Sequence, residues 1–281
     1  MSMAKLSVIT INRNNAAGLR KTIESVISQT FINYEYIIID GGSTDGSVDI
    51  IKQYADKITY WVSEPDTGIY NAMNKGIKVA KGEYLQFLNS GDWLYSNTVL
   101  DDVFKLDRTE DILYGSEILY YQDHRCFIKT YPTQLTGYFF YVGSLSHQAT
   151  FHKATLFDAL YSENYKIVSD WEFYIQKVII SNCSTYYLDK IIIYFDMTGI
   201  SQIQTFETLQ NNERKSVLEK YFPNRIMADY EKFKRLEEIA KYSLYPYVQL
   251  FSQYPKLQRI VRRFMKLLLI LAGKKHLIPH S

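Results

Sequence analysis

One stretch of the chain, from Ser63 to Asp92, constrains the fold more than any other segment. It contains, in order, a loop, a helical segment from about Gly68 to Ala80, the apolar run Tyr84 to Leu88, and an acidic turn that ends at Asp92. In open α/β sheets, ligands bind outside the carboxyl ends of the strands. The stretch therefore predicts an α/β architecture and an acidic site at the edge of its sheet.

The rest of the first 110 residues repeats this alternation of strand and helix. Buried strands are expected at Leu6 to Ile11, Tyr34 to Ile39 and Ile58 to Val62, with helical segments between them. Strands that alternate with helices imply right-handed crossovers and a largely parallel sheet. We therefore predict an α/β fold with a Rossmann-like, mostly parallel sheet and helices on both faces.

The pattern changes after about residue 110. A hairpin is expected at Ile112 to Tyr121 and Cys126 to Tyr131, and short strands are expected near 148–152 and within 184–196. A helix opens near Ser169, and from Thr205 onward the pattern is helical and charged. These changes predict a sheet domain over 1–203, with halves of about 1–110 and 111–203, and a C-terminal helical extension over 204–281.

Composition excludes some classes of protein. The chain has 281 residues, of which 47% are hydrophobic, enough for a sizeable core. A net charge of +2 argues against a broad basic surface for nucleic acid. Cys126 and Cys183 fit neither a metal-binding spacing nor a disulfide framework. With no visible signal peptide and no apolar run of membrane-spanning length, we expect a cytoplasmic protein.

The tail over 255–275 is basic and amphipathic. Its cationic residues interleave with apolar ones, and an apolar run follows. The cationic residues are Arg259, Arg262, Arg263 and Lys266. Such a helix is typical of contact with the inner face of a membrane, but packing on the domain or on a second subunit of a homodimer explains it equally well.

Polar residues follow each strand of the first half. The first strand offers Thr10 and Asn12, the second Asp40, the third leads to Asp66, and the fourth leads to Asn89, Ser90 and Asp92. Each group alone is also typical of a simple turn. If the strands are parallel, the groups meet at one edge, where oxygen atoms could hold a hard divalent cation and a ligand rich in hydroxyls and phosphates.

These residues, taken together, resemble the family 2 nucleotide-sugar glycosyltransferases, which have the GT-A fold. The resemblance covers roughly residues 4 to 200. Its pieces are Val8–Arg13 (VITINR), Asp40–Asp45 (DGGSTD), Ser63–Gly76 (SEPDTGIYNAMNKG), Gly82–Asp92 (GEYLQFLNSGD), His147-Gln148 and Ser169–Glu172 (SDWE).

The resemblance implies roles for the residues on the donor side. Thr10 and Asn12 would line the nucleoside pocket, Asp40 would accept a hydrogen bond from the base, and Asp66 with the segment from Gly68 through Asn71 to Asn74 would form the pocket floor. Asn89, Ser90 and Asp92 would correspond to the DxD element, which holds Mg²⁺ or Mn²⁺ against the diphosphate. Because Asn89 replaces the first acidic residue of that element, Asp92 is the expected metal ligand and Asn89 is assigned to nucleotide-sugar binding.

On the acceptor side, the resemblance implies that Asp170 is the catalytic base. Ser169 and Glu172 have the spacing of a capping box, so a helix cap is the alternative explanation, and both can hold. His147 and Gln148 would lie near the acceptor. The segment Met197–Ser201 resembles a loop that could close over the diphosphate.

The function that these residues favour is inverting transfer from a nucleotide-diphospho-sugar, with UDP the expected nucleotide, to a hydroxyl of a growing glycan or lipid-linked acceptor. One alternative is a nucleotide-sugar-binding protein without turnover, which Asn89 alone supports. A Rossmann oxidoreductase is disfavoured, because the loop after the first strand, residues 12–18, lacks the G-x-G-x-x-G fingerprint.

Overall fold

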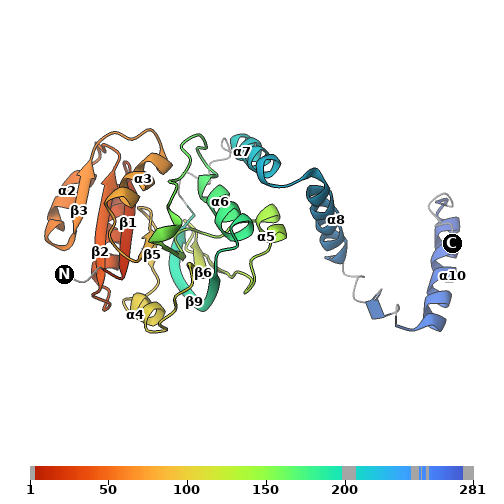
Figure 1. Cartoon of the computed structure of the whole chain (residues 1–281). Coiled ribbons are helices and arrows are strands. Elements are labelled where there is room, and N and C mark those ends of the chain that lie inside the picture. The colour runs from red at the N-terminus through yellow and green to blue at the C-terminus, as the bar shows by residue number, and fades with distance from the viewer. Residues whose placement is uncertain (1–3, 198–206, 242–246, 248, 251–252, 275–281) are drawn as a thin grey trace. The chain divides into compact units, whose positions relative to one another are not determined.

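The computed structural model describes residues 4–197, 207–241, 247, 249–250 and 253–274 (Figure 1). The chain divides into two compact units, Met1–Phe222 and Pro223–Ser281. Each unit is described by itself. The first contains the sheet and the candidate site, and the second contains helices.

The sheet and its helices all belong to the first unit. The strands are β1 (Leu6–Asn12), β2 (Tyr34–Asp40), β3 (Tyr60–Ser63), β4 (Tyr84–Phe87), β5 (Trp93–Leu94), β6 (Ile112–Tyr120), β7 (Cys126–Lys129), β8 (Thr150–Lys153) and β9 (Thr185–Asp196). The α-helices are α1 (Ala16–Ile27), α2 (Ser47–Gln53), α3 (Ile69–Val79), α4 (Val99–Phe104), α5 (Gly137–Val142), α6 (Ser169–Tyr174) and α7 (Glu207–Tyr221). A π-helical segment, Ile175–Ile180, continues α6.

The strands form one sheet in the order β3-β2-β1-β4-β8-β6-β9-β5, with β7 paired to β6. Strands β3, β2, β1 and β4 run parallel, as expected for the first half. In the second half, β8 is antiparallel to both β4 and β6, while β6 and β9 are parallel. The α/β fold is confirmed, and its parallel part lies mainly in the first half.

One face of the sheet carries an apolar cluster of buried side chains. Val8 of β1 and Ile38 of β2 belong to this cluster together with Leu19 and Ile23 of α1, and all four are fully buried. Both strands are continuous apolar runs because their two faces are covered, as parallel strands require. Burial of each such side chain contributes about 1.5–3 kcal/mol, so this face holds α1 firmly against the site-bearing strands.

The other face of β1 and β2 packs against α3. A Cβ atom placed on Gly76 would lie 2.5 Å from Cγ2 of Ile9 and 3.6 Å from Cγ1 of Ile39. Only glycine therefore lets α3 approach the sheet this closely. This contact holds α3 closely against β1 and β2.

The division between the units falls later than the predicted boundary between residues 203 and 204. Helix α7 belongs to the first unit, which ends at Phe222. Val217 of α7 is fully buried, and Glu213 is 8% exposed. The predicted functional division into a nucleotide half and an acceptor half stays a prediction.

The second unit contains α8 (Asn224–Ala240) and α10 (Pro255–Leu271). No residue of either helix is buried. On α10, Phe264 is 58% exposed and Leu271 is 74% exposed. Among the described residues, no helix is both long enough and apolar enough to cross a membrane.

Candidate active site

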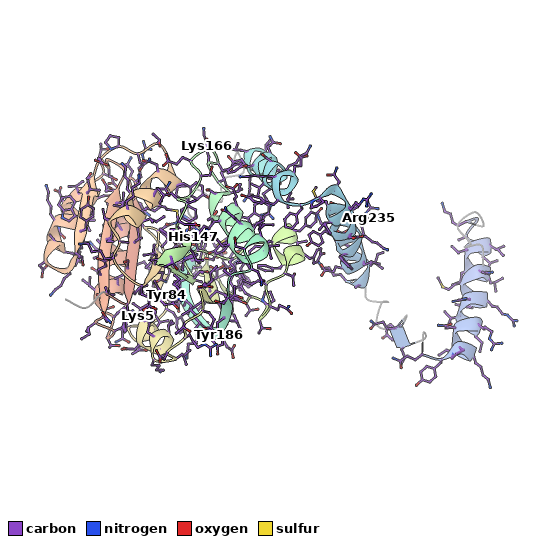
Figure 2. The ribbon with its side chains drawn as sticks, in the orientation of Figure 1. Lys5, Tyr84, His147, Lys166, Tyr186 and Arg235 are labelled. Carbon is purple, nitrogen blue, oxygen red and sulfur yellow. The ribbon has the colours of Figure 1, made fainter. Side chains whose placement is uncertain are left out.

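The polar groups predicted at the strand ends lie along one edge of the sheet. The register aligns Asn12 at the end of β1 with Asp40 at the end of β2. On the other side of β1, the Ser90 N–H donates to the carbonyl of Ile11 at 3.0 Å. Figure 2 shows His147 displaced from Lys5 and Tyr84, which precede β1 and open β4 at the opposite end. The sequence order therefore brings the predicted donor-side segments together.

Asp40 is the centre of a closed cluster of hydrogen bonds. Its fully buried carboxylate accepts four of them: from Asn12 Nδ2 (2.7 Å), the Ser43 N–H (2.9 Å), the Ser43 hydroxyl (2.6 Å) and the Ser63 hydroxyl (2.6 Å). The carbonyl oxygen of the Asn12 side chain is buried and has no partner among the described residues. The cluster thus fixes the ends of β1, β2 and β3 and leaves one free acceptor atom on Asn12.

A second carboxylate, Asp66, lies beside this cluster. Arg13 Nη1 is 3.9 Å from Asp66 Oδ1, which also accepts from the Gly68 N–H at 3.2 Å. A Cβ atom on Gly41 would lie 2.3 Å from Asp66 Oδ2, so a side chain there would force the carboxylate to move. Gly68 has φ 149°, a conformation that favours glycine. The loop before α3 is therefore shaped around Asp66.

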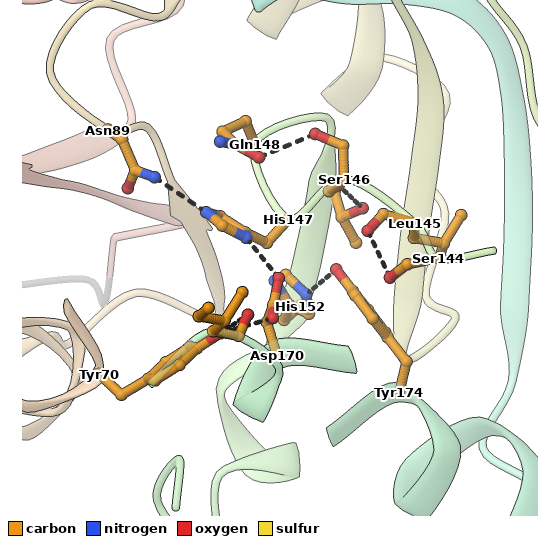
Figure 3. Close-up of polar contacts among 12 residues, drawn as sticks. Tyr70, Asn89, Ser144, Leu145, Ser146, His147, Gln148, His152, Asp170 and Tyr174 are labelled. Carbon is orange, nitrogen blue, oxygen red and sulfur yellow. Dashed lines mark hydrogen bonds and ion pairs between the residues drawn. The ribbon is translucent and has the colours of Figure 1, made fainter. Parts of the chain in front are cut away.

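A chain of polar contacts connects the turn after β4 with the start of α6 (Figure 3). Asn89 Nδ2 lies 3.1 Å from His147 Nε2, and His147 Nδ1 lies 2.9 Å from Asp170 Oδ2. The Tyr70 hydroxyl, from α3, lies 2.7 Å from Asp170 Oδ1. The Asp170 side chain is 18% exposed, so it is held on two sides and still reaches the surface.

The neighbouring residue Gln148 connects this chain to Asp92. Gln148 Nε2 donates to Asp92 Oδ2 at 3.1 Å, and the Asp196 N–H donates to Asp92 Oδ1 at 2.8 Å. The Ser146 hydroxyl donates to Gln148 Oε1 at 2.8 Å, which sets the orientation of the Gln148 amide. The structure therefore brings Asp92, His147, Gln148 and Asp170 into one connected network.

The three carboxylates, of which Asp40 and Asp92 are buried and Asp170 is partly exposed, differ in their acidity. Burial alone raises the pKa of Asp40, but the hydrogen bonds from Ser43, Ser63 and Asn12 outweigh it and lower the pKa. Burial likewise opposes the lowered pKa of Asp170, which results mainly from the hydrogen bond from His147, with a further hydrogen bond from Tyr70. Asp92 has fewer donors, so burial raises its pKa to about 7. Asp170 is thus ionised at neutral pH, as a proton acceptor must be.

Helix α7 fixes the loop that carries Asp170. Glu213 Oε1 and Oε2 accept from the N–H groups of Lys166 (2.8 Å) and Ile167 (3.0 Å). The Arg214 guanidinium lies 4.0 Å from the centroid of the Trp171 ring, and Trp171 directly follows Asp170. A carboxylate that accepts two backbone donors holds a loop more firmly than neutral contacts do.

The predicted capping box at the start of α6 is wrong. The N-cap is Val168, whose carbonyl accepts from the Glu172 N–H at 2.8 Å. Ser169 therefore lies one residue inside the helix, and its buried hydroxyl has no partner among the described residues. The Glu172 side chain binds Lys220 (2.8 Å) and Tyr221 (3.1 Å) of α7 instead.

Three predicted donor-side residues make contacts within the protein. Thr10 is fully buried, with its hydroxyl 3.1 Å from that of Tyr36. Asn71 and Asn74 donate to Glu163 at 3.0 and 3.1 Å, away from the Asp40 cluster. The Asn71 and Asn74 contacts tie α3 to the loop before α6. All three side chains are therefore engaged in contacts that position parts of the protein.

Tyr70 is a site residue that the sequence reasoning missed. It is 4% exposed, and its hydroxyl contacts both Asp170 and the carbonyl of Ile167 (2.7 Å each). The only signal in the sequence is its place in the segment that resembles the family, next to the predicted Asn71. Asp196, the last residue of β9, was also missed, because its backbone N–H binds Asp92 and a backbone group carries no residue signal.

The residues present fit a divalent cation shared with a ligand. Among the described residues, no three His, Cys, Asp or Glu side chains lie close enough to hold a metal ion alone. Mg²⁺ is usually held by one or two carboxylates plus substrate phosphates. Asp92 supplies one carboxylate, and the buried Asn89 Oδ1 has no partner among the described residues. These oxygens suit a hard cation completed by a diphosphate.

The sheet with its acidic carboxyl-end site defines an α/β enzyme of the GT-A glycosyltransferase type. A family model described as Glycosyl transferase family 2 matches residues 7–160, more than half of the chain, so the chain belongs to that family. The match includes β1, the Asp40 cluster, Asn89 to Asp92, and His147 with Gln148. Asp170 lies ten residues beyond it.

Curated relatives support this assignment. The chain is 28% identical over 207 residues to a PGL/p-HBAD biosynthesis glycosyltransferase of Mycobacterium bovis BCG Pasteur, covering 71% of this chain and 79% of the relative. It is 31% identical over 207 residues to an uncharacterised glycosyltransferase of Mycobacterium tuberculosis CDC 1551, covering 71% and 78%. The protein is therefore a glycosyltransferase.

Solved structures share the fold. S. aureus TarS 1–349 in complex with UDP aligns with a TM-score of 0.57 at 22% identity, over 68% of this chain and 60% of that chain. The mannosyltransferase PcManGT of Pyrobaculum calidifontis, in complex with GDP-Man and Mn²⁺, aligns with a TM-score of 0.53 at 13% identity, over 68% and 56%. The present chain thus spans less than two thirds of either structure.

Proposed function

We propose that the protein transfers a sugar, with inversion, from a UDP-sugar to a hydroxyl of a glycan or lipid-linked acceptor. The observation that carries the proposal is the placement of Asp170. Its ionised carboxylate is held by His147 and Tyr70, and the residue that follows His147, Gln148, donates a hydrogen bond to Asp92. This arrangement supplies a proton acceptor beside a site suited to a cation and a diphosphate.

The residues of the two clusters divide the work of the reaction. On the donor side, Asn12, Asp40, Asp66, Gly68, Asn89 and Ser90 would bind the nucleotide-sugar, with Thr10, Asn71 and Asn74 supporting them. The free carbonyl oxygen of the Asn12 side chain is one acceptor available to a nucleoside N–H or O–H. On the acceptor side, His147 and Gln148 border the base.

In the transfer step, the acceptor oxygen forms a bond to the anomeric carbon of the sugar. The bond from that carbon to the diphosphate oxygen breaks, and its electron pair leaves with the nucleoside diphosphate. The acceptor proton passes to the carboxylate of Asp170 as the new bond forms. Asp92 would hold Mg²⁺ or Mn²⁺, which when bound stabilises the charge that develops on the diphosphate.

The names of similar proteins support the choice of both the donor and the acceptor. The TarS structures include complexes with UDP and with UDP-GlcNAc. The name of one curated relative places it in the biosynthesis of PGL and p-HBAD, which is compatible with a lipid-linked acceptor. GDP-sugars remain the second class to test, because PcManGT holds GDP-Man.

A donor screen tests the proposal. UDP- and GDP-sugars are incubated with the full chain and Mn²⁺, and release of the nucleoside diphosphate is measured with and without a chelator. We expect release from a UDP-sugar that depends on the metal. UDP binding without release from any donor would favour the alternative of a nucleotide-sugar-binding protein without turnover.

We further propose that α10 binds the surface of an anionic membrane. Its exposed apolar residues recur at helical spacing, at Leu257, Phe264, Leu268 and Leu271. The described segment 253–274 contains basic residues and no acidic residue. A basic amphipathic helix of this kind lies in the interface of anionic bilayers, which would place the enzyme peripherally on the inner face of the membrane.

Vesicle sedimentation distinguishes membrane binding from a homodimer. The full chain should sediment with phosphatidylglycerol-containing vesicles and not with phosphatidylcholine alone. Replacing Arg259, Arg262 and Arg263 with glutamine should abolish this, while the same change at Lys232, Lys234 and Arg235 of α8 should not. Equal binding by both triple variants, or a vesicle-independent dimer that needs the α10 arginines, would contradict the proposal.

A further inference from the structure

Asn89 stands where the DxD element has an acidic residue, and its side chain makes a specific contact in the site. The amide nitrogen of Asn89 faces Nε2 of His147 at 3.1 Å. The opposite ring nitrogen, Nδ1, faces Asp170. A single imidazole ring therefore separates the altered position from the predicted base (Figure 3).

The hydrogen positions along the Asn89–His147–Asp170 contacts follow from the chemistry of Asn89 and Asp170. The carboxylate of Asp170 can only accept, so Nδ1 of His147 carries the proton and donates to it. In a neutral imidazole the other nitrogen is then an acceptor, which matches the Asn89 amide as a donor. All three side chains thus agree on one tautomer, with the proton on Nδ1.

An aspartate at position 89 could not complete the same arrangement. It has no N–H to offer Nε2, so the imidazole would face carboxylates on both sides and would draw a second proton onto Nε2. Asp170 would then be paired with an imidazolium, which weakens it as a base. Asparagine leaves Asp170 with a neutral donor and its full negative charge.

We propose that Asn89 is a positioning residue for the catalytic base, acting through His147, which it holds in the Nδ1–H tautomer. The inference rests on the proposed function of Asp170. Packing supports it, because the edge of the Phe87 ring meets the imidazole (centroids 6.5 Å apart, interplanar angle 83°) and limits its rotation. The Asn89 Oδ1 atom is buried and has no hydrogen-bond partner among the described residues.

Paired substitutions at Asn89 and His147 test the two polar contacts of the His147 ring. The variant Asn89→Asp should lower kcat by about tenfold or more, as on loss of a group that orients a reacting side chain, with the donor KM nearly unchanged. His147→Asn keeps a donor at the position of Nδ1 and should retain more kcat than His147→Gln, which keeps a polar group only at the position of Nε2. Asn97→Asp and His124→Asn, both at exposed positions, are the matched controls and should behave as wild type.

Nitrogen-15 NMR of the imidazoles reads the tautomer directly. The His147 signals, assigned by their loss in His147→Asn, should show a protonated Nδ1 and an unprotonated Nε2 in wild type, and protonation of both in Asn89→Asp. Wild-type kcat in Asn89→Asp, or tighter Mn²⁺ binding with raised kcat, would overturn the inference in favour of a metal-ligand role. The opposite tautomer in wild type would overturn it as well.

Asp170→Asn separates this inference from the proposed function. If Asp170→Asn keeps wild-type transfer, the base assignment fails and the inference falls with it. If Asp170→Asn is inactive while the Asn89 and His147 variants all keep wild-type kcat, the proposed function stands and only the positioning role is rejected.

Discussion

Asp40, the last residue of β2, and Asp92, in the turn between β4 and β5, lie on opposite sides of β1. Both are buried, yet their pKa values shift in opposite directions. Asp40 accepts four hydrogen bonds and has a lowered pKa. Asp92 accepts two and has a pKa raised to about 7. The additional donors around Asp40 therefore help to keep that carboxylate ionised, whereas burial dominates at Asp92.

The difference indicates different purposes for the two carboxylates. The donors around Asp40 come from the ends of β1 and β3 and from the loop after β2, so its charge holds the donor-side edge together. Asp92 is under-supplied with donors, so a ligand that brings positive charge would stabilise its ionised form. A buried carboxylate with few hydrogen-bond donors, and therefore a perturbed pKa, is typical of functional sites.

The largest expected effect is on catalysis. Asp170→Asn should reduce transfer by at least about 100-fold, because a general base contributes about 10²- to 10⁴-fold. Donor binding should persist, as measured by calorimetry with UDP and Mn²⁺. Asp189→Asn, at an exposed position of β9, is the control. Near-normal turnover in Asp170→Asn would remove Asp170 from the mechanism.

The second effect is on the pH dependence of stability. A carboxyl group whose folded pKa lies near 7 and whose unfolded pKa lies near 4 makes the folded state less stable as pH rises between those values, by up to about 4 kcal/mol. Relative to Asp92→Asn, the wild type should therefore lose stability between about pH 4 and pH 8. Urea unfolding at several pH values measures this difference. A difference that is constant with pH would contradict the raised pKa.

For Asp40→Asn, the pH dependence of the stability difference from wild type should have the opposite sign. The NH₂ group of the new amide would face the N–H and O–H groups that now donate to Asp40. We therefore expect a loss of about 3 kcal/mol in unfolding free energy at neutral pH. Because the folded pKa is lowered, the advantage of the wild type should shrink as pH falls below about 4. The exposed Asp56→Asn serves as control and should change stability by less than about 0.5 kcal/mol. Equal losses in both variants would refute the role of the Asp40 cluster.

The smallest effect concerns metal affinity. Protons compete with a cation for Asp92, so the affinity for Mn²⁺ in the presence of UDP should fall about tenfold for each pH unit below 7. Thermal shift titrations at about pH 6 and pH 8 measure this. In Asp92→Asn the pH dependence should disappear. If the wild-type affinity did not vary with pH, Asp92 would not be the ligand.

The fold could be predicted largely from local patterns. β1, β2 and β4 are short apolar runs, and their alternation with helices was sufficient to predict parallel pairing. By contrast, β5 has only two residues, Trp93–Leu94, and its partner is β9. Helix α5 has six residues, too few to show a period. Elements that depend on distant partners leave little trace in the sequence near them.

The site could be predicted only in part, for the same reason. Motif resemblance pointed to Asp92, His147 and Asp170, and the structure brings these into one network. Tyr70 reaches Asp170 across 100 residues of sequence, and nothing near Tyr70 indicates that contact. The capping box failed because Ser169 is the first residue of the helix and Val168 is its N-cap, and the Glu172 side chain binds α7 instead.

Helix α7 has a practical consequence for anyone who shortens this protein. A chain ended at residue 203, where the sheet pattern stops, would lose Glu213 and Arg214 and leave the Lys166 and Ile167 N–H groups without their carboxylate. Such a fragment would keep the Asp40 cluster but would lose the contacts that hold the loop before Asp170. Truncation after Phe222 preserves that brace, and with it the alignment of Asp170.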